Sequence, residues 1–395
     1  MTDPAPPAVV LVDSYPRILL GAQRRLLEWL DAWDPARATP VVLTPADGAL
    51  CEEVRARGVA SLIVPQPAAL ASYGGALLRG GVLAKAGRAA AAGRYAWSLR
   101  RALKRAGAAA VHCDDLRGVL TAGVAAKTLR LPVSRWSNLE APLGRLDALE
   151  LPLCDRVLCI TDAMRSKYPP AQQKKYAQKL RTIPGGVALA PLDAAGPDRP
   201  RFGVSESDFV VTVAGSLNRR KGLDRLLAVW SDIVAAVPNA KLLVAGEPGE
   251  LSEDREFAEN LPNRGLLSVS FLGHRGDVPT LMHSTDVLVL PSRHEGMGRV
   301  LLEAMACRKP CVGSTAGGIP EVVADGETGF IVDAADPAAL RDAVVRLGRD
   351  PALRTRMGEA GRARVERHFD ARRQTGALLE ELYALAHGEP PPAAA

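Results

Sequence analysis

The segment Pro291–Ala306, PSRHEGMGRVLLEAMA, carries two carboxylates, Glu295 and Glu303, around the start of a predicted helix. Glu295 lies in the loop before the helix, and Glu303 lies about a turn and a half into it. Gly296 and Gly298 leave room for a ligand beside the loop. A charge in a helix as apolar as VLLEAMA needs a partner, although Glu303 could also be an ordinary helix glutamate. The pattern favours one carboxylate on sugar hydroxyls and the other on a ribose.

A second cluster is the segment Val213–Gly222, VAGSLNRRKG, in which an apolar strand ends at a glycine and three cations follow. The backbone can approach a ligand closely at Gly215, and Arg219, Arg220 and Lys221 come directly before a new helix. Free N–H groups at a helix start, beside guanidinium and ammonium groups, are what a diphosphate binds. Basic clusters are usually solvated surface, but the position after a strand favours a phosphate site.

The segment Gly313–Gly329, GSTAGGIPEVVADGETG, has a diglycine directly before another predicted helix. Pro320 suits the first turn of that helix, and Glu321 follows it. The pair Gly317-Gly318 can bring backbone N–H groups against a ligand. Each of these three segments follows a predicted strand.

Short β-branched runs alternate with helical stretches along the whole chain, which predicts βα units around parallel sheets. Helices are expected, for example, around residues 23–33 and 116–129. The strands are expected at 8–13, 39–45, 61–65, 109–113, 132–136 and 156–161, and then at 209–215, 240–246, 269–273, 287–291, 310–314 and 329–333. Two successive series of this kind predict an α/β protein with two doubly wound, Rossmann-like domains.

At 395 residues the chain is long enough for two domains. We expect an N-terminal Rossmann-like domain at residues 1–190 and a C-terminal one at 191–370. Residues 371–395 should form a helix that returns toward the N-terminal domain, followed by a disordered PPPAAA tail. The stretch Ala188–Pro200, ALAPLDAAGPDRP, is rich in Pro, Ala and Asp and is the predicted linker and hinge.

Charge is divided unevenly between the two halves of the chain. Residues 1–200 carry 27 Lys and Arg against 17 Asp and Glu, and no acidic residue occurs between Arg55 and Cys113. The basic stretch 82–107 reads as one or two helices with an aromatic and aliphatic face made by Tyr95, Trp97, Leu99 and Leu103. Such a face can lie on an anionic membrane or meet a lipid-linked acceptor or nucleic acid. The favoured alternative is a crossover helix that packs on its own sheet.

Other sequence features limit the class of protein. Six scattered cysteines, without a CxxC pair or clustered histidines, predict buried reduced thiols and no metal site. No run reaches the roughly eighteen apolar residues that a membrane span needs, and the start MTDPAPPAVV lacks the features of a secretory signal. We therefore expect a cytoplasmic protein, peripheral at the inner face of the cell membrane if the basic face binds lipid.

Together these segments resemble the retaining GT-B glycosyltransferases, specifically the large family 4 of nucleotide-sugar transferases. In the C-terminal half the resemblance runs through GSLNRRKG, FLGHRGDVPTLM, DVLVLPSRHEG, GRVLLEAMACRKPCVGS and GGIPEVVADGETGFIVD, with Glu295 and Glu303 in E-x7-E spacing. The N-terminal half matches more loosely, through Gly21-Ala22-Gln23-Arg24, VHCDD, CDRVLCITDAM and TIPGGV. The resemblance spans about Val9 to Phe369. It implies the GT-B fold, in which two Rossmann-like domains face each other across a cleft.

The resemblance also implies a role for individual residues. Arg220 and Lys221 would hold the donor diphosphate. Glu303 would bind the ribose, and Glu295 would contact the transferred sugar. The other donor-binding residues would be Gly21, Gly215 and Ser216 beside the phosphates, Gly298, Arg299 and Val300 with their backbone N–H groups, and His274 and Arg275 beside the nucleobase.

Two departures from the family pattern affect the implied site. Ser216 stands where many relatives have an arginine, so the phosphate clamp rests on Arg220 and Lys221. Relatives often read H-x-H in the N-terminal domain, with the second histidine facing the donor sugar, and here the run is His112-Cys113-Asp114. His112 and Asp114 are therefore the N-terminal candidates for the catalytic site, with Asp114 taking part of the usual histidine role.

The implied reaction moves a sugar from a nucleoside diphosphate, UDP favoured and GDP open, to a hydroxyl of a glycan or lipid-linked acceptor. It would serve polysaccharide, lipopolysaccharide or glycolipid synthesis, with retention at the anomeric carbon and no metal or cofactor. The leaving phosphate would take the acceptor proton while the cations and the helix dipole stabilise its charge. The alternatives are a sugar-nucleotide epimerase, a phosphorylase, and a donor-binding, catalytically silent partner of a transferase complex. No segment resembles a nucleic-acid-binding module.

Overall fold

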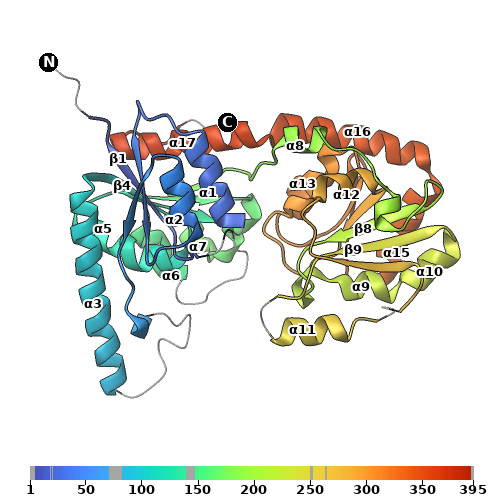
Figure 1. Ribbon diagram of the computed structural model, residues 1–395, viewed down its shortest axis with the longest axis horizontal. Coiled ribbons are helices and arrows are strands. Elements are labelled where there is room, and N and C mark those ends of the chain that lie inside the picture. The colour runs from blue at the N-terminus through green and yellow to red at the C-terminus, as the bar shows by residue number, and fades with distance from the viewer. Residues whose placement is uncertain are drawn as a thin grey trace.

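The chain folds into two lobes, each a parallel β-sheet covered by helices on both faces (Figure 1). The computed structural model describes residues 5–17, 19, 21–70, 82–138, 147–249, 252–262 and 265–392. Among these residues the first sheet has the order β3-β2-β1-β4-β5-β6-β7, and the second has the order β10-β9-β8-β11-β12-β13. The strand order turns back at β1 and β8, so the carboxyl ends of these strands border a crevice where α/β sheets bind ligands. The predicted α/β architecture with two doubly wound, parallel-sheet lobes is confirmed.

The first lobe holds the elements up to residue 182 and the last helix. Its strands are β1 (Ala8–Val12), β2 (Thr39–Thr44), β3 (Ala60–Ile63), β4 (Ala108–Cys113), β5 (Val133–Ser137), β6 (Arg156–Cys159) and β7 (Leu180–Thr182). Its helices are α1 (Gly21–Asp31), α2 (Ala49–Ala56), α3 (Val82–Arg105), α4 (Leu116–Gly118), the π-helical η3 (Val119–Gly123), α5 (Val124–Thr128), α6 (Asp147–Leu153), the 3-10 helix η5 (Asp162–Lys167), α7 (Pro170–Lys175) and α17 (Ala371–His387).

The second lobe holds the elements between residues 189 and 368. Its strands are β8 (Phe209–Ala214), β9 (Ala240–Ala245), β10 (Val269–Gly273), β11 (Val287–Leu290), β12 (Cys311–Ser314) and β13 (Gly329–Val332). Its helices are α8 (Leu189–Asp193), the 3-10 helix η8 (Arg219–Lys221), α9 (Leu223–Ala228), α10 (Trp230–Ala236), α11 (Ser252–Glu259), α12 (Val278–Ser284), α13 (Arg299–Ala306), α14 (Ile319–Val322), α15 (Pro337–Arg349) and α16 (Pro351–His368).

All twelve strands predicted from the sequence are present, with ends within about two residues of the prediction. Their runs are recognisable because a parallel strand with helices on both faces is apolar throughout. The prediction missed β7, which is a three-residue edge strand with a charged middle residue, Arg181. That side chain pairs with Glu381 of α17 at 2.9 Å, so the strand is fixed by a partner two hundred residues away.

The basic stretch 82–107 forms one long helix, α3. Tyr95, Leu99 and Leu103 are buried against the neighbouring elements, and the helix packs on η3, α5 and β4. Trp97, which the sequence pattern placed on the same face, is instead 57% exposed and lies beneath Arg101 at 4.6 Å from the ring centre. The apolar side therefore behaves as a crossover helix, while the cationic side remains at the surface.

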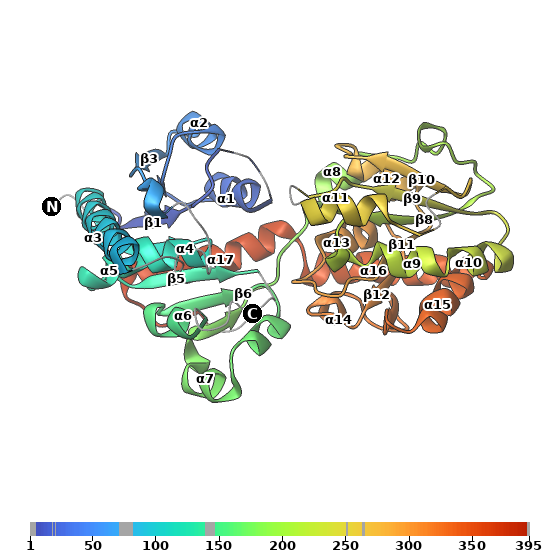
Figure 2. The same cartoon turned by 90° about the horizontal axis from the view of Figure 1, so that it is seen from below.

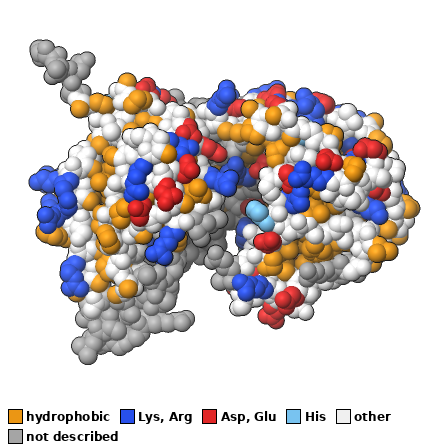
Figure 3. All heavy atoms as spheres, viewed as in Figure 1, with side chains coloured by type: hydrophobic (Ala, Val, Ile, Leu, Met, Phe, Trp, Pro, Cys, Tyr) orange, Lys and Arg blue, Asp and Glu red, His pale blue; other side chains and the backbone are white. Residues whose placement is uncertain are grey.

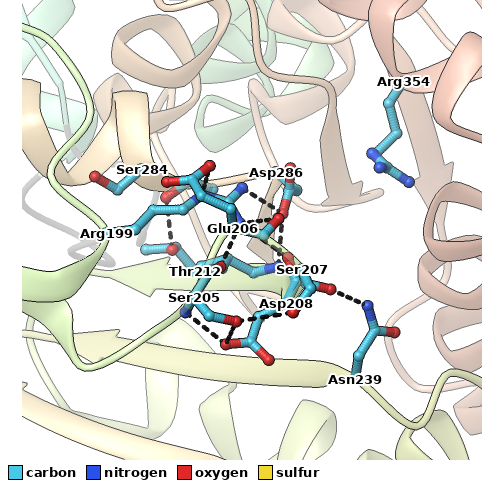
Figure 4. A network of polar contacts seen from close by, with 12 residues as sticks. Arg199, Ser205, Glu206, Ser207, Asp208, Thr212, Asn239, Ser284, Asp286 and Arg354 are labelled. Carbon is cyan, nitrogen blue, oxygen red and sulfur yellow. Dashed lines mark hydrogen bonds and ion pairs between the residues drawn. The ribbon is translucent and has the colours of Figure 1, made fainter.

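The segment Ala188–Pro200, expected to be a linker, is instead part of the second lobe. It contains α8, which packs against α12 and α13, and its Asp193 pairs with Arg362 of α16 at 2.5 Å. Arg199 is buried and pairs with Asp286 at 2.9 Å, within the polar network of Figure 4. Proline and aspartate were read as signs of a flexible connection, but here α8 is packed and Asp193 attaches it to α16.

The chain crosses between the lobes at two neighbouring points. The N–H of Val187 donates to the carbonyl of Phe369 at 2.9 Å, and the N–H of Ala371 donates to the carbonyl of Val187 at 3.1 Å. The two crossings thus form a short parallel bridge. The backbone that connects the lobes is thus hydrogen-bonded at this bridge, whereas residues 188–200 pack within the second lobe.

After the second crossing, α17 runs back across the first lobe and packs on α1, β1 and β4 (Figures 1 and 2). It begins at Ala371, where the side chain of Asp370 accepts hydrogen bonds from two N–H groups of its first turn. Residues 393–395 of the predicted disordered tail lie outside the described residues.

The cysteines agree with the prediction of buried reduced thiols. All of them are buried and free. Burial raises the pKa of the Cys154 and Cys307 thiols to about 12, so they stay protonated at neutral pH.

Candidate active site

Apart from Gly21, the predicted donor-binding residues lie on the loops and helix starts that follow the carboxyl ends of β8, β10 and β11. The loop after β11, Pro291–Gly298, faces the first lobe directly, because the hydroxyl of Thr161 donates to the carbonyl of Gly296 at 3.1 Å. A deep hollow separates the lobes on the face seen in Figure 3. These loops therefore border the space between the two sheets, where ligands of α/β proteins bind.

Glu295 is the centre of a charged cluster in this loop. Its carboxylate lies 2.6 Å from Nζ of Lys221 and 3.5 Å from the guanidinium of Arg220. The hydroxyl of Ser292 donates to the same carboxylate at 3.3 Å. Glu295 is 8% exposed, whereas Arg220 is 44% exposed. The cluster unites three of the predicted catalytic residues and carries an excess of positive charge, as binding of a phosphate requires.

Local structure explains how η8 presents its cations. Asn218 caps η8, and its side-chain oxygen accepts from the N–H of Lys221 at 3.2 Å. The N–H of Arg293 donates to the carbonyl of Arg220 at 2.7 Å, and the Arg293 guanidinium binds Asp224 through two contacts of 2.7 Å. The sequence analysis missed Arg293 and Asp224, since no local pattern links two residues 69 positions apart.

The start of α13 has the geometry expected of an anion-binding helix end. Gly298 adopts a left-handed conformation with φ of 79°, which a residue with a side chain rarely does. No side chain among the described residues caps this helix, so the N–H groups of Arg299 and Val300 are placed at an uncapped N-terminus.

Glu303 lies one turn further along α13. Its backbone carbonyl accepts from the N–H of Cys307 at 3.2 Å, but within the part of the chain that the structure describes its side chain forms neither a hydrogen bond nor an ion pair. Burial raises the pKa of this carboxyl above its usual value, while the positive charge of Arg299 acts in the opposite direction. A half-buried carboxylate without a protein partner fits a residue whose partner is a ligand.

The remaining second-lobe candidates lie at the same edge of the sheet. Gly215 and Ser216 are exposed directly after β8, and His274 is exposed after β10. Arg275, also expected beside the nucleobase, is half-buried, and its guanidinium binds Asp277 at 2.5 and 2.8 Å. His274 is therefore the more available of the two side chains.

The first-lobe candidates divide between the core and the edge of the sheet. His112 is 1% exposed, its Nδ1 lies 2.8 Å from the Ser134 hydroxyl, and its ring meets the edge of Trp29. Burial lowers the pKa of His112 to about 3, so the ring is neutral at physiological pH. Asp114, at the end of β4, is 8% exposed. Gly21 begins α1 and is exposed, with open space where a side chain would stand.

Arg25 is a first-lobe residue that the sequence analysis missed. Its guanidinium binds Asp114 at 2.5 Å and lies 5.3 and 4.9 Å from the ring centres of Trp29 and Trp136. It lines a small cavity between the lobes together with Arg299. The sequence feature that could have identified Arg25 is its position one turn after Gly21, on a helix that follows a strand.

Known structures with the same arrangement identify the fold. The structure of the Anabaena protein Alr3699/HepE in complex with UDP and glucose superposes with a TM-score of 0.74 at 19% identity, covering 95% of this chain and 98% of that one. This chain has the GT-B fold. Sucrose-phosphate synthase from Thermosynechococcus elongatus superposes with a TM-score of 0.70 at 20% identity, covering 96% of this chain and 99% of that one.

Sequence comparison adds a family match for the second lobe. Residues 196–364 match the family model of the group 1 glycosyl transferases. This range includes Arg220, Lys221, Glu295 and Glu303, but none of the first-lobe candidates.

Relatives of known name match over part of the chain. N-acetyl-alpha-D-glucosaminyl L-malate synthase of Bacillus anthracis is 34% identical over 43% of this chain and 44% of its own length. The GDP-mannose-dependent monoacylated alpha-(1-6)-phosphatidylinositol monomannoside mannosyltransferase of Corynebacterium glutamicum is 33% identical over 47% of this chain and 51% of its own. Alpha-maltose-1-phosphate synthase of Mycobacterium tuberculosis is 31% identical over 60% and 62%. The match thus spans about half the length of these relatives.

Proposed function

We propose that this chain is a retaining, metal-independent glycosyltransferase that moves a sugar from a nucleoside diphosphate to an acceptor hydroxyl. The observation that carries the proposal is the cluster of Glu295, Lys221 and Arg220 beside the uncapped start of α13. It lies in the segment that matches the group 1 glycosyl transferases, and the named relatives are synthases and a mannosyltransferase.

In the proposed reaction the second lobe holds the donor. Arg220, Lys221 and the N–H groups at the start of α13 stabilise the charge that develops on the leaving diphosphate. Glu303 binds the ribose hydroxyls, and Glu295 binds hydroxyls of the transferred sugar. The oxygen of the acceptor hydroxyl bonds to the anomeric carbon from the face that the diphosphate leaves. The leaving phosphate oxygen accepts the proton of that hydroxyl. The bond from the anomeric carbon to the diphosphate breaks in the same step.

The first lobe, residues 1–190 in this proposal, holds the acceptor. We propose that Asp114, rather than His112, is the first-lobe residue that contacts the transferred sugar. The Asp114 carboxylate lies at the edge of the sheet beside Arg25, whereas the His112 ring is enclosed among core side chains. Gly21 leaves backbone space beside the phosphates from the same edge.

UDP is the favoured nucleotide of the donor, with GDP as the alternative. Two observations bear on this preference: the structural neighbour HepE is described in complex with UDP-glucose, while the Corynebacterium relative is named for GDP-mannose. His274 would contact the base from the loop after β10, since its side chain is exposed.

A thermal-shift panel of UDP, GDP, ADP and TDP tests the proposed donor. A nucleotide that binds the folded chain at about 100 times its Kd stabilises it by roughly 2.7 kcal/mol, so the matching base should raise the Tm by several degrees. The same nucleotide should lose most of this effect on the Lys221→Gln variant. A panel in which no nucleotide moves the Tm would refute the proposal.

The acceptor is proposed to be a glycan or a lipid-linked sugar, met at the cytoplasmic face of a membrane. The cationic side of α3 presents Arg100, Arg101, Lys104 and Arg105 at the surface with no acidic neighbour on that helix. Such a face attracts anionic lipid. No helix among the described residues combines the length and the apolar character required to cross a bilayer, so any membrane contact proposed here is peripheral.

A further inference from the structure

The 3-10 helix η5 begins at the interface between the lobes, and its cap comes from the opposite lobe. The N–H of Asp162 donates to one carboxylate oxygen of Glu321 at 2.8 Å, and the N–H of Ala163 donates to the other at 2.7 Å. Glu321 belongs to α14 in the second lobe, 158 positions away from Ala163. One carboxylate therefore binds two consecutive backbone N–H groups across the interface, which we call the interlobe cap.

Thr161 occupies the N-cap position of η5 but does not cap it. Threonine at this position normally accepts a hydrogen bond from the first turn. Here its side chain makes no cap hydrogen bond, and its hydroxyl instead donates to the carbonyl of Gly296 at 3.1 Å. The residue that should complete η5 within its own lobe is thus used to bind the other lobe, and Glu321 supplies the missing acceptor.

The interlobe cap is continuous with the loop that carries Glu295. Gly296 directly follows Glu295, and the N–H of Gly318 donates to the carbonyl of Glu295 at 3.3 Å. A Cβ at Gly318 would lie 2.3 Å from the Gly296 carbonyl oxygen and 2.4 Å from Cγ2 of Thr161, so only glycine fits there.

Glu321 is itself held in place from α16. The guanidinium of Arg364 donates to the carbonyls of Glu321 and Val322, both at 2.8 Å. The carboxylate is therefore attached to a packed helix and not to a free loop, so its contacts with η5 fix the first lobe relative to that helix.

We propose that Glu321 and Thr161 are positioning residues that hold the lobes closed and fix the loop bearing Glu295. This inference deepens the proposed function, on which its catalytic consequence rests. When the lobes separate, η5 loses the carboxylate that caps it and the Gly296 carbonyl loses its first-lobe donor. Closure and the arrangement of Glu295 are thereby coupled.

The sharpest test removes a backbone donor instead of a side chain. Asp162→Pro deletes the N–H that binds Glu321, and the extended backbone of Thr161, with φ of −147° and ψ of 161°, suits a residue before proline. Asp162→Ala is the matched control, because it loses the same contacts with Arg165 and Thr182 but keeps the N–H. Both substitutions are made in the wild-type and Glu321→Ala backgrounds of the full chain.

Two quantities are measured on these four variants, on Glu321→Ala alone and on the wild type: the radius of gyration by small-angle scattering, and the release of UDP from UDP-glucose. Relative to Asp162→Ala, we expect Asp162→Pro to enlarge the radius of gyration. We also expect kcat to fall about tenfold, the value of one charge-assisted hydrogen bond, with the KM for UDP-glucose within about twofold. In the Glu321→Ala background, the proline should add nothing further to either quantity.

A proline that acts only through local strain would have the same effect in both backgrounds, and that result would overturn the proposal. An unchanged radius of gyration for Glu321→Ala would also overturn it. Thr161→Val should lower kcat and Thr161→Ser should restore it, which a purely steric role of the side chain would not produce. If wild-type protein releases no UDP from UDP-glucose, the proposed donor fails, while the scattering measurements still decide whether the interlobe cap holds the lobes together.

Discussion

The two lobes share one sheet plan but differ in where they place their reactive side chains. In the second lobe, Lys221 and Glu295 come from loops after neighbouring strands and meet at 2.6 Å at the surface of the sheet edge. In the first lobe, His112 lies within the strand and is buried against Trp29, and only Asp114 with its partner Arg25 reaches the edge. The same fold can therefore carry a site made of local segments or one that depends on tertiary packing.

The largest effect should follow from removing the central cation of the second lobe. We expect Lys221→Gln to lower turnover about a hundredfold, because it loses charge-assisted contacts worth roughly 1.5–3 kcal/mol each. Calorimetry should also show a large loss of affinity for the bare nucleotide. Arg219→Gln is the matched control, since Arg219 lies two residues earlier on η8 and is exposed. Equal losses of turnover and nucleotide affinity in both variants would mean that any positive charge on η8 has the same effect, and that the contact of Lys221 with Glu295 is not needed.

Substitutions in the two lobes should differ in their effect on the affinity for UDP. Asp114→Asn should slow transfer but leave the affinity for UDP within about twofold, because its proposed partner is the sugar and not the nucleotide. A large loss of UDP affinity in this variant would remove the proposed division of labour between the lobes.

The two glutamates of the second lobe should separate in the same measurement. Glu295→Gln should lower turnover about tenfold or more and bind the nucleoside diphosphate nearly as before, since the sugar is absent from that ligand. Glu303→Gln should instead weaken the bare diphosphate, because the ribose is present in both ligands. If Glu295→Gln loses nucleotide affinity and Glu303→Gln does not, the two assignments are reversed.

The buried histidine of the first lobe predicts a pH effect on stability rather than on chemistry. Burial holds the pKa of His112 near 3 in the folded protein, against about 6.5 when unfolded. The unfolded chain binds the extra proton between these values, so this contribution is complete above pH 6.5 and is lost as the pH falls toward 3. Between pH 5.5 and 4.5, wild type should lose about 1 kcal/mol more unfolding free energy than His112→Gln. Urea denaturation at the two pH values measures this difference. Equal losses of unfolding free energy in wild type and His112→Gln would contradict the prediction.

The smallest effect on the folded protein should come from the exposed side of α3. Neutralising Arg100, Arg101, Lys104 and Arg105 together should leave the Tm nearly unchanged, since surface charges contribute little to stability. It should nevertheless abolish co-sedimentation with phosphatidylglycerol vesicles at low salt. Lys174→Gln with Lys175→Gln, on the exposed α7, is the control. If wild type does not bind these vesicles, the membrane contact is excluded and α3 is a crossover helix only.

The sequence was most informative where a single segment contains both the strand and its functional loop. The twelve strands and the separate segments that carry Lys221 and Glu295 could be predicted because apolar runs and the polar residues that follow them are contiguous, whereas the contact between these two residues could not. The contacts Arg25–Asp114, Arg293–Asp224 and Asp162–Glu321 could not, because they join residues 69 to 159 positions apart through the packing of helices and lobes. The burial of His112 was not anticipated either, although this residue lies within the apolar strand AAAVHC.

The bridge between Val187 and the Phe369–Ala371 crossing has a consequence for biosynthesis. Everything between these points belongs to the second lobe, so that lobe can complete its sheet as soon as its own residues have left the ribosome. The first lobe must wait, because α17 covers β1 and β4 and the Tyr383 hydroxyl accepts from the N–H of Asp34 at 2.8 Å. The first lobe is therefore synthesised first but completes its folding last.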